Sequence, residues 1–338
     1  MTDLMRAVQI TELTGPDTAL KLVELAEPEA SHPLTPGEGV VIDVRAAGVS
    51  FPELLQTRGL YQIKPELPFV PGSEVAGVVR SAPAGAAASP GDRVAAFPLS
   101  GGFAEVAVAP APLTFALPDK LDFRQGAGLI LNYHTAYFAL RTRGRLQAGE
   151  TVLVQGAAGG VGTAALQVAG GLGARTIAVV STDAKEVVAR AAGADHVLRS
   201  GGPWKDEARE LGGVDVVFDP VGGDRFTDSL RSLNPGGRLV VVGFTGGAIP
   251  EVRVNRLLLT NTDVVGAGWG SYVLGGWGTD TEARVGYLQE TAAALEEMIA
   301  SSHVAPIVGA GFPLEQAADA LKLIESRGAT GKIVLDVG

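Results

Sequence analysis

The sequence contains no cysteine among its 338 residues. Disulfide bonds, thiolate metal sites and a cysteine nucleophile are therefore excluded. Basic residues are also in the minority, because 27 Lys and Arg stand against 37 Asp and Glu, which gives a formal net charge of −10. Nucleic-acid binding needs a basic footprint, so this charge argues against it as a general function.

Long and strongly hydrophobic runs are scarce as well. The one uncharged run that approaches membrane-span length, residues 156–174, is mostly Gly and Ala and is too weakly apolar to be a good span. The opening residues MTDLMR lack the apolar stretch of a signal peptide. With 46% hydrophobic and 19% charged residues, we expect a globular cytoplasmic protein of two domains, each with its own core.

The most informative motif is a glycine-rich turn, TVLVQGAAGGVG at residues 151–162, where an apolar strand runs into a helix. Because glycine has no side chain, the backbone can turn sharply here and approach a pyrophosphate. The N-terminus of the helix offers its N–H groups to that anion. A second apolar strand, residues 176–180, ends where the ribose of a dinucleotide should lie. We predict a dinucleotide site rather than a purely structural turn. The predicted contacts are Gly156, Gly159, Gly160, Val161 and Gly162.

Strand and helix patterns alternate from about residue 125 onward, which is typical of βαβ units and a parallel sheet. The first third is rich in Pro and Gly with short apolar runs, which predicts a compact β-rich domain. The expected fold class is therefore α/β, with a doubly wound parallel sheet of the Rossmann type. The expected elements of this part are 126–140 (helix), 151–155, 161–171, 176–180, 184–192, 214–219, 225–233, 238–243, 263–266 and 281–301.

The residues after the second strand indicate which dinucleotide binds. An NAD site usually has Asp or Glu there for the ribose 2′-hydroxyl, whereas this chain has Ser181, followed by Thr182 and Lys185. Hydroxyls and an ammonium suit a 2′-phosphate, which a carboxylate would repel. We therefore predict NADPH. The alternative is that Lys185 is only a solvated lysine. In that case Asp183 would be the acid that binds the ribose hydroxyls, with the alignment of the motif shifted from position 181.

Several further motifs give the chain a resemblance to a known family. They are GVSFPELL (48–55), GLY (59–61), PFVPGSEVAG (68–77), NYHTAY (132–137), DVVFDPVGG (215–223) and GKIVL (331–335). In this order they resemble the zinc-independent quinone oxidoreductase (zeta-crystallin-like) branch of the medium-chain dehydrogenase/reductase superfamily. The resemblance implies a GroES-like β-rich catalytic domain at 1–124 and 305–338, and a Rossmann domain at 125–304. It also implies a substrate site in the cleft between them and a homodimer or homotetramer.

Zinc-dependent members of this superfamily have a cysteine and a histidine where this chain has Ser50 and Ser73. Neutral hydroxyls are poor zinc ligands compared with thiolate and imidazole. The four histidines show no close pairing along the sequence; they are His32, His134, His196 and His303. We therefore predict no metal site.

The resemblance also implies roles for individual residues. Tyr61 and Ser50 would face the substrate as catalytic residues, with Ser50 a shorter donor than the asparagine of many members. Thr135 and the backbone around Val221, Gly243 and Phe244 would lie near the nicotinamide, and core packing stays an alternative for Phe244. Arg327 would reach the 2′-phosphate, while Ser200 replaces an aromatic residue that some members place there.

The leading functional hypothesis is an NADPH-dependent reductase of quinones or α,β-unsaturated carbonyls that transfers a hydride without zinc. Its partner would be a small molecule, with no role for nucleic acid or a membrane. An enoyl-thioester reductase of the acrylyl- or enoyl-CoA type stays open, since such enzymes share the fold. A nucleotide-binding structural or regulatory protein of the crystallin kind is the third hypothesis.

Overall fold

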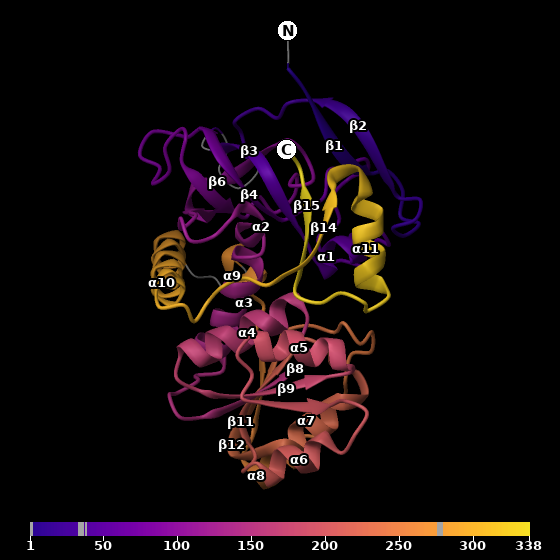
Figure 1. Cartoon of the computed structure of the whole chain (residues 1–338), viewed down its shortest axis with the longest axis vertical. Helices are drawn as coiled ribbons and strands as arrows, with labels where there is room; N and C mark the ends of the chain where they lie inside the picture. Colours follow the sequence, from indigo (N-terminus) through magenta and orange to yellow (C-terminus); the bar gives the residue numbers. More distant parts are fainter. Residues whose placement is uncertain (1–2, 33–36, 38, 276–279) are drawn as a thin grey trace. The chain divides into compact units, whose positions relative to one another are not determined.

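The computed structural model describes residues 3–32, 37, 39–275 and 280–338 (Figure 1). The chain divides into two compact units. Residues 1–131 and 306–338 form the first, called here the terminal unit, and residues 132–305 form the second, the inserted unit. The sequence predicted domains of 1–124 with 305–338 and of 125–304.

The inserted unit is built on a parallel sheet of six strands in the order β10-β9-β8-β11-β12-β13. The strands are β8 (Thr151–Gln155), β9 (Arg175–Val180), β10 (His196–Arg199), β11 (Val214–Asp219), β12 (Leu233–Val241) and β13 (Asp263–Gly266). This is the Rossmann order, and its direction of winding reverses between β8 and β11. The predicted α/β class and parallel sheet are thus confirmed.

Helices lie on both sides of this sheet, with α4 and α5 along one side and α6 and α7 along the other (Figure 1). Their bounds are α4 (Gly160–Gly171), α5 (Asp183–Ala191), α6 (Trp204–Glu210) and α7 (Phe226–Ser232), and the unit adds α8 (Asn255–Thr260), α9 (Trp269–Val273) and α10 (Thr281–Ala300). Leu153, Val217 and Phe226 belong to the core that these layers enclose. Among the described residues, no helix is long and apolar enough to span a membrane.

The helix expected at 126–140 begins and ends later than expected. After the short helix α2 (Phe123–Gly126), an unbroken helical stretch runs through a π-type segment at Ile130–His134, α3 (Thr135–Tyr137) and a second π-type segment at Phe138–Arg143. The Leu131 N–H donates to the Glu74 carboxylate at 2.9 Å. The first N–H groups of a helix have no partner within it, and Glu74 supplies one at the start of this helical stretch. The predicted helix is therefore present from Ile130 onward.

The terminal unit contains a larger sheet with the order β14-β15-β3-β4-β5-β7, to which β6 adds by pairing with β3. The strands are β3 (Gly39–Val49), β4 (Glu74–Ser81), β5 (Arg93–Ala96), β6 (Val106–Pro110), β7 (Thr114–Ala116), β14 (Val308–Pro313) and β15 (Lys332–Asp336). A separate antiparallel pair, β1 (Leu4–Ile10) and β2 (Leu20–Ala26), and the helices α1 (Phe51–Gln56) and α11 (Ala317–Glu325) complete the unit. Its core includes Ile42, Val75 and Leu335.

His134 makes folding of the inserted unit sensitive to acid. The ring is buried 5.5 Å from the Trp269 ring, and burial lowers the pKa of His134 from 6.5 to about 3. The unfolded chain therefore binds a proton below about pH 6.5 that the folded chain rejects, so stability is present above that pH and falls as the pH decreases.

We expect the free energy of unfolding to fall by about 2.5 kcal/mol between pH 7 and about pH 4.5 through this residue. Denaturant titrations of the parent and of His134→Phe should show a shallower pH slope in the variant. His303→Gln, at an exposed histidine, leaves His134 intact and should keep the slope of the parent. Equal slopes in all three proteins would contradict the assignment.

Candidate functional site

The glycine-rich turn joins β8 to α4 at the point where the sheet changes its winding direction. Gly156 has a φ of +60°, a conformation that side chains rarely adopt. A Cβ at Gly162 would lie 2.3 Å from the Gly156 carbonyl oxygen, so this position must be glycine for α4 to pack against the turn. A Cβ at Gly159 would meet only that same oxygen, at 3.5 Å. The missing side chain at Gly159 therefore leaves space above the turn that the protein does not fill.

The N-terminus of α4 faces this space. Gly159 is the N-cap residue, and no side chain caps the helix. Neighbouring Gly160 and Val161 are half-buried. The first N–H groups of a helix have no partner within it, and they attract an anion. An open space beside uncapped N–H groups fits the pyrophosphate of a dinucleotide.

The loops after β11 and β12 meet beside the same turn. Asp219 Oδ1 accepts the Val221 and Gly222 N–H groups, both at 2.9 Å, and this holds the first loop in a tight turn. The second loop is attached to it, because the Thr245 N–H donates to the Pro220 carbonyl at 3.0 Å. Burial raises the pKa of Asp219, and the two N–H donors oppose that shift.

Three predicted nicotinamide contacts lie in or beside these loops. A Cβ on Gly156 would be 3.1 Å from the Val221 side chain, so Val221 lies directly against the glycine turn. Gly243 is half-buried, and a Cβ there would be 3.4 Å from the Pro220 carbonyl oxygen. The Phe244 ring is 37% exposed and packs over Gly222, where a Cβ would approach it to 2.9 Å. Phe244 therefore packs against the first loop and stays partly exposed to solvent.

Thr135 and Arg327 lie elsewhere in the chain. Thr135 is half-buried and begins the short helix α3 of the inserted unit. Arg327 is exposed and follows α11 of the terminal unit with a left-handed φ of +59°. Their contacts with a cofactor stay predictions.

The predicted ribose end follows β9. Ser181 and Thr182 are exposed and Lys185 is half-buried. The Thr182 hydroxyl is the N-cap of α5 and accepts the Lys185 N–H at 3.3 Å. This bond places Lys185 in the first turn of the helix, one turn from Ser181.

Arg199 is a cation that the sequence analysis missed. It ends β10, directly opposite Val180 at the end of β9, and its guanidinium donates to Asp183 at 2.6 Å and to Glu186. Arg199 thus balances the two acids in the first turn of α5, which would otherwise repel a phosphate. The pairing of β9 with β10 could have suggested it, because adjacent parallel strands end side by side.

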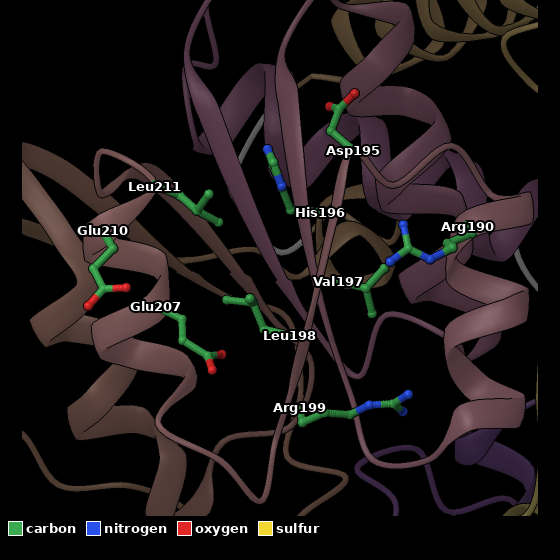
Figure 2. Close-up of a pocket in the computed structure, with 9 residues that line it drawn as sticks. All are labelled: Arg190, Asp195, His196, Val197, Leu198, Arg199, Glu207, Glu210 and Leu211. Atoms are coloured by element: carbon green, nitrogen blue, oxygen red, sulfur yellow. The ribbon is translucent and has the colours of Figure 1, made fainter.

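An open pocket of mixed polarity lies beside Arg199 (Figure 2). Figure 2 shows Arg190 and Arg199 on one side of β10, with Glu207 and Glu210 of α6 on the other. None of the predicted site residues lines it. The pocket is therefore separate from the glycine turn, although Arg199 in its lining also pairs with the acids at the start of α5.

The predicted substrate residues lie in the terminal unit. Ser50 is half-buried between β3 and α1, and its hydroxyl oxygen accepts a hydrogen bond from the Lys332 ammonium at 2.8 Å. Tyr61 is half-buried in the segment after α1. Burial raises the pKa of Tyr61, and the nearby Glu53 carboxylate adds to the shift. The Tyr61 hydroxyl is thus protonated at neutral pH and can donate a hydrogen bond.

The surroundings of Ser50 and Ser73 do not fit zinc. The Ser73 hydroxyl donates to the Glu53 carboxylate at 2.6 Å, and the Ser50 hydroxyl is bound to a lysine ammonium. A cation is already present here, and hydroxyls are poor zinc ligands compared with thiolate and imidazole. Within the described ranges, no group of three or more His, Asp or Glu side chains could hold a metal ion.

Comparisons with known proteins agree with this arrangement. Residues 36–119 match the alcohol dehydrogenase GroES-like domain, and residues 160–282 match a family described as zinc-binding dehydrogenase. Human quinone oxidoreductase is 34% identical over 98% of each chain.

Solved structures are similar over the whole chain as well. A probable oxidoreductase from Mycobacterium abscessus is 43% identical with a TM-score of 0.87, covering 100% of both chains. The quinone oxidoreductase of Thermus thermophilus, also solved in complex with NADPH, is 34% identical with a TM-score of 0.83 and covers 98% of this chain and 100% of its own. The chain therefore belongs to the quinone oxidoreductase branch of the medium-chain dehydrogenase/reductase superfamily.

Proposed function

We propose that this oxidoreductase uses NADPH to reduce quinones or α,β-unsaturated carbonyls without zinc. The observation that carries the proposal is the open space over Gly159 at the N-terminus of α4. It lies at the crevice of the sheet, where open α/β folds bind their ligands. The NADPH complex of the Thermus thermophilus relative supports the choice of cofactor.

Each part of the proposed site has a defined task. The α4 N-terminus and its glycine turn bind the pyrophosphate, and the Val221 and Phe244 loops flank the nicotinamide. Bound NADPH supplies the hydride. Ser50 and Tyr61 donate hydrogen bonds to the carbonyl oxygen, where negative charge develops as the hydride arrives. The predicted domains, 1–124 with 305–338 and 125–304, are part of this proposal.

A homodimer or homotetramer is also part of the proposal. β13 is an edge strand of the inserted unit's sheet. The preceding helix, α8, exposes Leu258 and Leu259, each 77% accessible. An open strand edge beside exposed leucines is a surface that a second copy can cover.

NADPH oxidation should be measured across quinones, enals, enones and enoyl thioesters, with and without exhaustive chelation. We expect turnover with quinones or enones at a rate that chelation does not change. Preference for an enoyl thioester would favour the thioester reductase instead. NADPH binding without turnover of any acceptor would favour a structural or regulatory role, and a stoichiometric zinc whose removal stops turnover would contradict the zinc-free chemistry.

The glycine turn can be tested by placing side chains in it. Gly159→Val should weaken NADPH binding by at least about 100-fold, because the new methyl groups occupy the space for the pyrophosphate, while the fold tolerates them. Gly170→Val, in the same helix where a Cβ meets nothing within 4 Å, is the matched control and should keep the parent's affinity. Fluorescence titration with NADPH and thermal unfolding measure the two effects. Parental affinity in Gly159→Val would show that the phosphate site lies elsewhere.

The cofactor preference depends on Ser181 and Lys185. A hydrogen bond to a charged group contributes about 1.5–3 kcal/mol, so each phosphate contact is worth roughly 10- to 100-fold in affinity. We expect NADPH to bind tighter than NADH by a factor of this order. Ser181→Asp should erode or reverse the preference, because its carboxylate repels the 2′-phosphate and accepts from the ribose.

Lys185→Ala should weaken NADPH binding alone and flatten its dependence on salt. Lys21→Ala, at an exposed lysine of β2 in the terminal unit, is the control for loss of a positive charge. Calorimetric titration of both cofactors into each protein makes the comparison. Equal affinities of the parent for NADPH and NADH would show that these residues do not read the 2′-phosphate.

A further inference from the structure

A cluster of buried charges lies behind Ser50 in the terminal unit. Glu53 is 1% exposed, Glu74 is 0% exposed and Lys332 is 3% exposed. Burying charged groups is costly unless they pair and satisfy their hydrogen bonds. Hydride transfer as described above requires none of the three, so the cluster calls for a physical explanation.

The hydrogen bonds of this cluster converge on Ser50. The Lys332 ammonium donates to Glu74 Oε2 at 2.6 Å and to Ser50 Oγ at 2.8 Å. The other Glu74 oxygen accepts the Leu131 N–H at 2.9 Å. Glu53 accepts the Ser50 N–H at 2.9 Å as well as the Ser73 N–H and hydroxyl. Both carboxylates are thus satisfied, and both connect to Ser50, one directly and one through Lys332.

Strand pairing brings these residues together. In the sheet, β3 lies between β15 and β4, with Ile333 opposite Val49 and Gly48 opposite Glu74. Gly48 has no side chain for a steric reason, because a Cβ would be 2.2 Å from the Ala127 carbonyl oxygen, 2.7 Å from Lys332 Cε and 2.9 Å from Glu74 Oε2. The glycine on the central strand thus makes room for the lysine and the glutamate to meet beside Ser50.

The direction of the bond to Ser50 has a chemical consequence. An ammonium has donors only, so the Ser50 oxygen is the acceptor in this pair. The hydroxyl hydrogen of Ser50 is therefore directed away from Lys332. A hydroxyl that accepts a charge-assisted bond is polarised toward donating its own proton, since chained hydrogen bonds strengthen one another.

We propose that Lys332, held by Glu74, is a positioning residue that orients and reprotonates Ser50 during carbonyl reduction. This inference rests on the proposed function. As the hydride adds to a carbon of the substrate, two electrons pass to the carbonyl oxygen. The Ser50 O–H bond breaks and a new O–H bond forms on that oxygen. A Lys332 N–H proton then moves to the Ser50 oxygen, and the neutral amine regains a proton from water before the next turnover.

The electrostatics of the cluster make a neutral variant of Lys332 feasible. Burial raises the pKa of Glu74, and the Lys332 ammonium beside it opposes the shift. Burial also raises the pKa of Glu53, with the Ser73 hydroxyl and Lys332 opposing it. When the ammonium is removed, the Glu74 carboxyl can therefore take up a proton rather than remain as an unpaired buried charge.

A double-mutant cycle tests the inference, with kcat and KM measured on an acceptor that the parent reduces. Ser50→Ala and Lys332→Met should each lower kcat by about 100-fold, a typical contribution of proton transfer by a positioned group. The NADPH dissociation constant, measured by fluorescence titration, should stay at the parental value. The double variant should be no slower than either single variant within about twofold, because Lys332 acts through Ser50.

Two further variants control for charge and for folding. Lys322→Met makes the same substitution at a half-buried lysine of α11 that pairs with Asp17, and should keep the parental kcat. If Lys332→Met does not fold, Lys332→Met with Glu74→Gln removes both charges and takes its place in the cycle.

Each outcome has one meaning. Losses in kcat that multiply in the double variant would show that Lys332 acts independently of Ser50, and would overturn the inference. Parental kcat in Lys332→Met, with the parent active, would overturn it as well while leaving the proposed function in place. A parent that reduces no acceptor overturns the proposed function itself, and this inference with it.

Discussion

The buried ion pair between Lys332 and Glu74 is the interaction on which the terminal unit depends. Its partners are 258 residues apart, and both are almost fully removed from water. When one partner is removed, the other must change its protonation state or stay charged in the core without a partner. The pair therefore fixes the position of the last strand, β15, beside β3. The terminal unit is thus formed by the first and the last part of the chain, and the inserted unit lies between them in the sequence.

The two units use different groups to stabilise charge. The terminal unit buries carboxylates and an ammonium around one hydroxyl, Ser50. The inserted unit instead presents backbone N–H groups at the start of α4, where no side chain caps the helix. Backbone donors with an open space suit a large anion such as a pyrophosphate. A polarised hydroxyl suits the smaller charge that develops on a carbonyl oxygen.

Local patterns predicted the inserted unit well because its strands are short, apolar and separated by turns. The alternation of strands and helices gave the parallel sheet, and the spacing of Gly156, Gly159 and Gly162 located the turn at its crevice. The helix expected at 126–140 is present from Ile130, and its first turn is bound by Glu74, a strand residue 57 positions before Leu131, which no local pattern could show. Arg199 was missed because its place beside β9 depends on strand order.

By itself the sequence determined the chemistry that is available: glycines at the turn between an apolar strand and a helix, no cysteine, and neutral serines at positions 50 and 73. Those conclusions follow from side-chain composition at single positions. Only the tertiary structure decided that Lys332 donates to Ser50, 282 residues earlier in the chain. No local pattern encodes that contact, because it arises when antiparallel pairing brings β15 against β3 and Gly48 leaves the space between them.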